Sequence, residues 1–200
     1  FYLSAGTHQL TLESVREPMA VGEIRLCTAE TAPAYEEYLT LHQAETGVTG
    51  FYEMIQGEEA VRKSSQVIYP VTDRSSASTV PNSPSNIRLN TLGGEKWQTA
   101  GHWVEWTVTV PKSGLYKMAG RVRQNVVQGA FSTRRLTVNG KVPFAEAENI
   151  QVGYDMAWQY LTLAGKDGEP YYLYLEKGEN TLRLEAALGD MSALLGGTFA

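Results

Sequence analysis

The feature that most constrains the fold is a strict alternation of side chains between Trp103 and Val110. In the run WVEWTVTV every second residue, from the first valine on, is apolar, and the residues between these are Glu or Thr. A period of two, carried by β-branched and aromatic residues, predicts a half-buried β-strand. Pro111 and the turn residues 112–114 end this strand before a second one opens at Tyr116.

Further strands are expected at the spacing typical of a β-sandwich. The Asn139-Gly140 pair between two alternating runs is a strong signal for a hairpin turn. No long helical pattern separates the strands, so the sequence predicts an all-β fold, an antiparallel β-sandwich of the jelly-roll type. The other expected strands are 52–60, 87–91, 116–123, 134–138 and 160–163, followed by a final hairpin over 171–186.

An internal repeat indicates the domain organisation. Residues 1–13 and 173–185 share one pattern, in which a strand and a glycine turn precede a strand with alternating leucines. Residues 1–27 are therefore expected to be the C-terminal strands of a preceding related sandwich, an N-terminal β-hairpin segment. Residues 28–50 are expected to form a short helical connector and linker, with a helix from Pro33 to His42, and 51–195 the intact sandwich.

Composition and charge exclude several classes of function. The chain carries 17 Lys and Arg against 22 Asp and Glu, a net charge of −5, which argues against nucleic acid as a partner. No apolar run approaches the roughly 18 residues of a membrane span, so direct membrane insertion is not expected. The three histidines lie in separate elements, and no metal-binding or nucleotide-binding spacing is present, so an enzyme is not expected.

The single cysteine and the start of the chain bear on its compartment. Cys27 cannot form an internal disulfide, which fits either the cytosol or a Gram-positive exterior. The chain begins at Phe1 without a leader pattern, so it is expected to be a fragment that lacks an export signal encoded upstream.

Aromatic residues in the expected loops are candidates for contact with a sugar. Trp97 follows a Gly-Gly turn, and Tyr154 and Trp158 bound another loop. An exposed ring can stack on the flat C–H face of a sugar. The alternative is that these rings only pin their loops to the sandwich. Trp106 belongs to the inward-facing set of its strand and is expected in the core.

The end of the predicted strand at 121–125 supplies polar candidates. Arg123, Gln124 and Asn125 could donate hydrogen bonds to sugar hydroxyls, or to the carboxylate of an acidic sugar. The alternative is that the arginines of this strand solvate an outward face.

Three of these segments carry a family resemblance. The run W-x-E-W-T-V-x-V-P-x-S-G-L-Y, the strand end 121–125 and the segment 55–60 resemble galactose-binding-like carbohydrate-binding modules of families six and thirty-five. The resemblance implies non-catalytic binding of oligo- or polysaccharide, and it implies that Glu58 ligates a structural calcium. Calcium needs several oxygen ligands, and the expected closing strand after Leu184 is not evident. The alternative, that Glu58 is a solvated or hydrogen-bonded strand residue and binds no metal, therefore remains open.

A longer resemblance runs from about 51 to 195. This stretch is similar to the non-catalytic domains of extracellular solute-binding lipoproteins that serve sugar ABC importers in Gram-positive bacteria. The resemblance implies a cell-surface location and attachment to the solute-binding lobes of the same parent protein. A second hypothesis is a structural spacer or protein-interaction sandwich without a sugar site. The strand edges of 1–26, cut from their own sheet, further predict a homodimer through strand pairing.

Overall fold

The computed structural model describes residues 5–13, 21–22, 24 and 31–189, and it divides into two units, residues 1–30 and 31–200. In the first unit none of the described residues lies in a helix or strand, and all of them are exposed. The strand expected over residues 7–13 is thus not seen in this described segment. Residues 1–4, the other expected strand of this hairpin, lie outside the described residues, as does Cys27.

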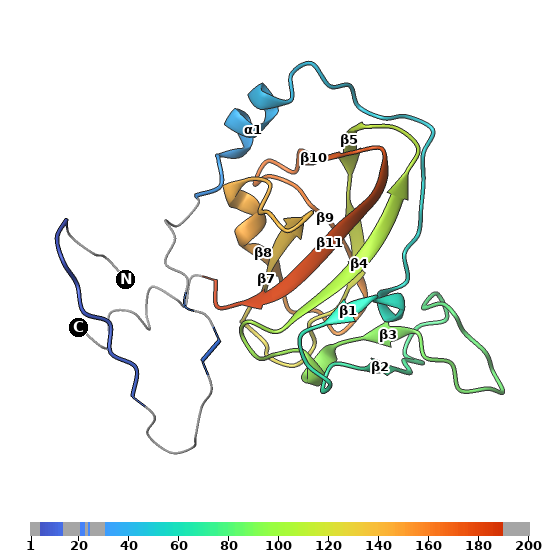
Figure 1. Ribbon diagram of the computed structural model, residues 1–200. Helices are drawn as coiled ribbons and strands as arrows, with labels where there is room; N and C mark the ends of the chain where they lie inside the picture. Colours follow the sequence, from blue (N-terminus) through green and yellow to red (C-terminus); the bar gives the residue numbers. More distant parts are fainter. Residues whose placement is uncertain (1–4, 14–20, 23, 25–30, 190–200) are drawn as a thin grey trace. The chain divides into compact units, whose positions relative to one another are not determined.

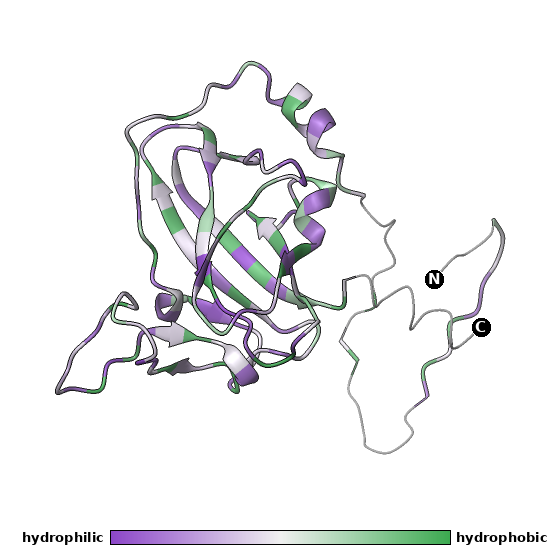
Figure 2. Cartoon of the chain, turned by 180° about the vertical axis from the view of Figure 1, so that it is seen from behind, coloured by the Kyte–Doolittle hydropathy of each residue, from purple (hydrophilic) through white to green (hydrophobic). Residues whose placement is uncertain are grey.

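The second unit is built on a five-stranded antiparallel sheet with the order β1-β4-β11-β7-β8 (Figure 1). The alternating run is confirmed as β4, which pairs along its whole length with β11. Apolar and polar residues alternate along the long strands (Figure 2). The strands are β1 (Arg62–Lys63), β4 (Trp103–Val110), β7 (Ser132–Val138), β8 (Ile150–Val152) and β11 (Gly178–Ala187).

A second layer faces this sheet. In it β5 (Gly114–Lys117) pairs with β10 (Tyr172–Leu175), and β6 (Ala119–Val122) pairs with β9 (Gln159–Thr162). The two pairs are continuous, because only Met118 separates β5 from β6, and its carbonyl accepts the Leu163 N–H at 3.0 Å. The residues between the layers form the main core, which confirms the β-sandwich. They include Val108, Val110, Leu136 and Val138 from one layer and Tyr116, Leu173 and Leu175 from the other.

The turns that follow β4 and β10 are connections between the layers. β4 and β5 follow one another in sequence, as do β10 and β11, but each pair divides between the two sheets. The predicted final hairpin over 171–186 is therefore wrong. Alternation shows that each strand is half buried, but it does not show which sheet the strand joins. The two corners lie side by side, since the Lys177 N–H donates to Ser113 Oγ at 2.8 Å.

The predicted Asn139-Gly140 turn is confirmed. Both residues have positive φ, 50° and 81°, as a two-residue turn of this kind requires. Val138 and Lys141 exchange two backbone hydrogen bonds across it, at 2.8 and 3.0 Å.

The segment before β1 departs from the expected strand over 52–60. Residues 51–56 are in no strand, and η1 (Gly57–Glu59) is a 3-10 helix. The expected strand 87–91 is reduced to β3 (Thr91–Leu92), which pairs with β2 (Pro70–Val71) and so anchors a long loop between them. Two further 3-10 helices are η2 (Gly94–Lys96) and η3 (Ala145–Glu148).

The expected connector helix is confirmed as α1 (Tyr35–Leu41). Its Tyr35 and Tyr38 hydroxyls accept the N–H groups of Tyr172 and Tyr174 at 2.8 and 2.6 Å, which closes the outer edge of β10. The helix thus belongs to the same compact unit as the sandwich, and that unit begins at Thr31. In the described part of the chain no helix has the length and apolar character needed to cross a membrane.

Candidate functional site

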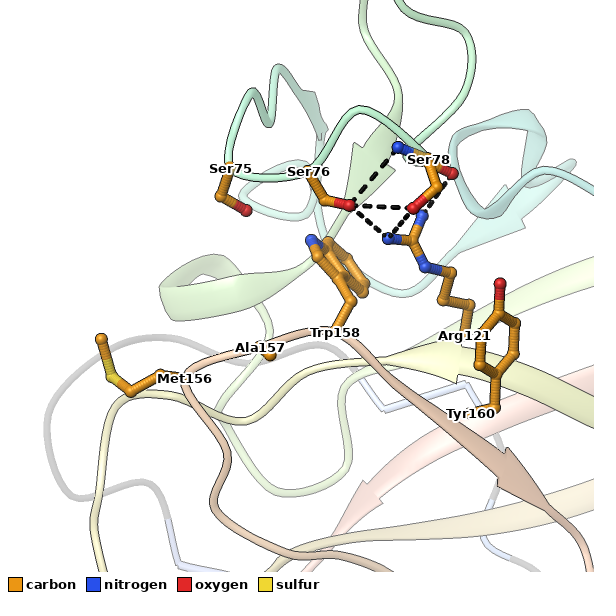
Figure 3. Close-up of a pocket in the computed structure, with 8 residues that line it drawn as sticks. All are labelled: Ser75, Ser76, Ser78, Arg121, Met156, Ala157, Trp158 and Tyr160. Atoms are coloured by element: carbon orange, nitrogen blue, oxygen red, sulfur yellow. Dashed lines mark hydrogen bonds between the residues drawn. The ribbon is translucent and has the colours of Figure 1, made fainter.

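A pocket of about 430 Å³ opens at one end of the second layer, between the loop after β2 and strands β6 and β9 (Figure 3). The pocket is open to solvent, since Tyr160 is 79% exposed and Met156 is 66% exposed. Its lining combines polar and apolar side chains. The lining residues are Ser75, Ser76, Ser78, Arg121, Met156, Ala157, Trp158 and Tyr160.

Arg121 ties the serine-rich loop to the sheet. Its guanidinium donates to Ser76 Oγ at 2.9 Å and to the Ser78 carbonyl oxygen at 2.6 Å, and also to Thr79 Oγ1 at 3.0 Å. On the strand, Arg121 lies directly opposite Tyr160 in the β6–β9 register. A guanidinium, hydroxyl groups and an exposed ring are thereby brought to one surface, although they come from three separate parts of the chain (Figure 3).

Asp73 connects the same loop to Trp158. Its carboxylate accepts hydrogen bonds from Arg123 at 2.5 Å and from the Trp158 indole N–H at 3.3 Å. The Arg123 guanidinium also stacks 4.8 Å from the centre of the Trp158 ring. Burial alone would raise the pKa of the Asp73 carboxyl, but hydrogen bonds from Ser75, Trp158 and Arg123 outweigh it and lower that pKa below its ordinary value.

The prediction that Trp97 offers a ring to a sugar is wrong. Trp97 is only 8% exposed and packs in a second core cluster with Ile68 and Val104. Its indole N–H donates to the His102 carbonyl oxygen at 2.8 Å, and Arg134 stacks 4.5 Å from its ring centre. The alternative reading of a ring that pins its loop holds for this tryptophan.

Among the other predicted site residues only Trp158 lines the pocket. Gln124 is committed to its own loop, since its amide donates to the carbonyls of Val127 and Ala130 and its oxygen accepts two backbone N–H groups, so its predicted contact with a sugar is contradicted. Asn125 is exposed and Tyr154 is half-buried, and neither lines the pocket. Arg123 lies behind Trp158 rather than in the pocket wall.

Several pocket residues were not among the predicted candidates. The exposure of Tyr160 could have been predicted from the sequence, because Tyr160 alternates with the inward-facing Leu161 along its strand and must therefore point outward. The three serines gave no signal beyond the polar composition of their loop. In the structure Arg121 holds Ser76 and Ser78 at the pocket, whereas Asp73 and Arg123 hold Ser75.

The expected calcium ligand Glu58 lies in η1. Its Oε2 atom is buried without a hydrogen-bond partner, and burial raises the pKa of its carboxyl. In the described residues no group of three or more His, Cys, Asp or Glu side chains could hold a metal. Glu185 on the closing strand is already engaged by Arg135 at 2.6 Å. The orphaned oxygen is what a cation would explain, but one carboxylate falls short of the six to eight oxygens that calcium takes.

No protein-family model matches this sequence, and comparison with curated proteins finds no match. Several solved structures are similar. A family 35 carbohydrate-binding module from Clostridium thermocellum is 20% identical, with a TM-score of 0.48, over 69% of this chain and 88% of that one. A family 35 module from an environmental isolate is 17% identical, with a TM-score of 0.40, over 69% and 85%. A ruminal GH26 endo-β-1,4-mannanase is 18% identical, with a TM-score of 0.44, over 70% of this chain but 24% of that enzyme. These values do not assign the chain to a family, so its function must be argued from the site.

Proposed function

We propose that residues 31–189 form a non-catalytic sugar-binding module whose oligo- or polysaccharide ligand lies over Tyr160 in the open pocket. The observation that carries this proposal is the ring of Tyr160, which is 79% exposed on a strand and is paired in register with Arg121. A large aromatic ring left in water beside fixed hydrogen-bonding groups is the combination that a sugar needs.

The chemistry divides between the apolar and polar parts of the pocket. The Tyr160 ring offers apolar surface to the C–H face of a sugar ring, and Met156 adds apolar surface at the other end of the pocket (Figure 3). The hydroxyls of Ser75, Ser76 and Ser78 can exchange hydrogen bonds with sugar hydroxyls. Arg121 holds two of these serines in place, so little side-chain freedom is lost when a ligand binds.

Trp158 has a supporting part in this proposal. One face of its indole is covered by Arg123, and its N–H is taken by Asp73, so a sugar would meet only the part of the ring that lines the pocket.

The test is a titration of soluble polysaccharides, chosen from a glycan array, against the wild type and Tyr160→Ala. We expect Tyr160→Ala to lower the affinity at least tenfold, a loss of about 1.4 kcal/mol, with the melting temperature unchanged. Tyr52→Ala is the matched control, because Tyr52 is an exposed tyrosine, 85% accessible, that does not line the pocket. A folded wild type that binds nothing at millimolar sugar, or a Tyr160→Ala variant that binds as well as the wild type, would overturn the proposal.

A second candidate function is protein interaction. The observation that favours it is the loop after β6, where Val126, Val127 and Phe131 are 60%, 54% and 64% exposed. A protein that binds no sugar but captures a purified solute-binding partner, and loses it in Val127→Asp, would support this function instead.

We further propose the cellular context that the sequence resemblance implies. The module would be displayed outside a Gram-positive cell, attached to the solute-binding lobes of a sugar importer, with Glu58 contributing to a structural calcium. Strand pairing by residues 1–26 would give a homodimer. Cell fractionation tests the location, and light scattering over a range of concentrations tests the dimer.

A further inference from the structure

The wall of the pocket is a loop that has no secondary structure of its own. Between β2 and β3, residues 72–90 are in neither helix nor strand. Such a segment keeps one conformation only where specific side-chain contacts hold it, because the backbone gains few hydrogen bonds from its neighbours.

The backbone of Asp73, near the start of this loop, is fixed by hydrogen bonds to one buried side chain. The buried Asn90, 6% exposed, accepts the Asp73 N–H at 2.7 Å and donates to the Asp73 carbonyl oxygen at 2.9 Å. The same amide donates to the Pro81 carbonyl at 3.1 Å, which holds the return of the loop. The Asp73 side chain therefore projects from a set position.

Both oxygens of the Asp73 carboxylate are used, and the side chain is only 11% exposed. Oδ1 accepts the N–H of Ser75 at 2.9 Å, the hydroxyl of Ser75 at 2.6 Å and the indole N–H of Trp158. Oδ2 accepts Arg123. One carboxylate thus joins the serine wall, the ring in the opposite loop and the end of the β6 strand.

Trp158 is consequently held at its edge and by two arginines, since Arg121 also lies over the ring, 5.3 Å from its centre. Asp73 holds the edge of the ring through its N–H, and Arg123 lies on its face, itself kept there by Asp73 and by Ser75 at 2.6 Å. Without the carboxylate, the indole N–H and the guanidinium would lose a shared acceptor at the same time.

We infer that Asp73 is a positioning residue for the pocket, one that sets the angle of the Trp158 ring and fixes Ser75, the first residue of the serine wall, without touching a ligand itself. The importance of this positioning for sugar binding rests on the proposed function, whereas the positioning of the ring and the loop by Asp73 does not. Charge-assisted hydrogen bonds are about twice as strong as neutral ones, so removal of the charge should release both parts.

The test compares Asp73→Asn with Asp167→Asn in the absence of ligand. Asp167 is a matched control, because its Oδ1 accepts the N–H two residues on, at 3.1 Å, as that of Asp73 does, and it has no arginine or indole partner in the described part of the chain. The readouts are hydrogen exchange of residues 74–80 and the near-UV circular dichroism of Trp158, defined as the wild-type spectrum minus that of Trp158→Phe.

We expect Asp73→Asn to speed exchange of the loop at least tenfold and to abolish the Trp158 band, while Asp167→Asn changes neither. Asp73→Ala should give a larger effect of the same kind, and thermal melts show whether each variant folds. Exchange within twofold of the wild type together with an unchanged band would overturn the inference. A wild type that binds no sugar would overturn the proposed function alone, because these readouts need no ligand.

Discussion

Trp97 and Trp158 occupy two regions built from the same parts, a loop indole with an arginine stacked on it. Arg134 lies 4.5 Å from the centre of the Trp97 ring, and Arg123 lies 4.8 Å from that of Trp158. The regions differ in what the indole N–H meets. Trp97 donates to a carbonyl five residues away, at His102, whereas Trp158 donates to Asp73, 85 residues away.

This difference separates a region of the core from the region that lines the proposed sugar site. The Trp97 ring is buried in the second core cluster, and burial of the arginine beside it lowers the pKa of Arg134 to about 10. The Trp158 region instead depends on a carboxylate delivered by a distant loop, and it remains partly open to water as the wall of a pocket. A bridge between two loops leaves a hollow, which a contact within one loop does not.

The largest effect expected is on stability, from Trp97→Ala. Removal of a buried tryptophan costs about 3–5 kcal/mol, which for a domain of this size lowers the melting temperature on the order of 10 °C. Trp158→Ala should cost at most about 2 kcal/mol, because its ring is only partly buried. Calorimetric melts of both variants measure this, and equal losses would break the comparison between the two regions.

An acid titration should separate the two regions next. The lowered pKa of Asp73 means that its contribution is complete above the ordinary value of 3.8 and is lost as the pH falls through the lower folded pKa. The charged groups that face this site are Arg123, which pairs with Asp73 directly, and Arg121, which lies with Arg123 over the Trp158 ring. We expect the near-UV band of Trp158 to disappear in a step below pH 3.8, and that of Trp97 to persist until global unfolding. Asp73→Asn should show no such step.

The smallest effect expected concerns Glu58, beside the Trp97 region. The Trp106 indole donates to the Gly57 carbonyl at 3.0 Å, so η1 packs on the same cluster. Because burial raises the Glu58 pKa, ionisation destabilises the fold above that folded pKa and costs nothing below the ordinary value of 4.5. Glu58→Gln should raise the melting temperature by a few degrees at pH 7 in chelator and leave it unchanged at pH 4.

Glu59→Gln, in the same turn but exposed, is the control for that measurement. Millimolar calcium that stabilises the wild type but not Glu58→Gln would support the proposed metal. A Glu58→Gln variant that is less stable than the wild type in chelator at pH 7 would contradict the account of an unpaired buried carboxylate.

The sequence predicted well wherever the signal was local. The alternation of β4, the positive-φ turn at Asn139-Gly140 and the helix after Pro33 each depend on residues within a few positions of one another. Prediction failed for the hairpin over 171–186, because the sheet that a strand joins depends on partners far away in the chain. The strand expected over residues 7–13 is likewise not seen in that described segment.

The candidate site was harder to predict than the fold. Trp97 and Trp158 both lie in loops between expected strands, and the prediction did not distinguish the buried ring from the one in the pocket. Gln124 looked like a ligand donor, but all four of its side-chain hydrogen bonds are local. Tyr160 could have been found from the parity of its strand, whereas the serine wall could not.

The amino-acid order by itself determined the strand pattern, the inward set of β4 and the tight turns, because these follow from backbone geometry and from the burial of neighbouring side chains. Only the tertiary structure decided which aromatic ring faces water. That outcome depends on whether a hydrogen-bond acceptor reaches the indole from its own loop or from one 85 residues away. Pairings over such separations carry no signature in a single sequence, since their free energy appears only after the chain has folded.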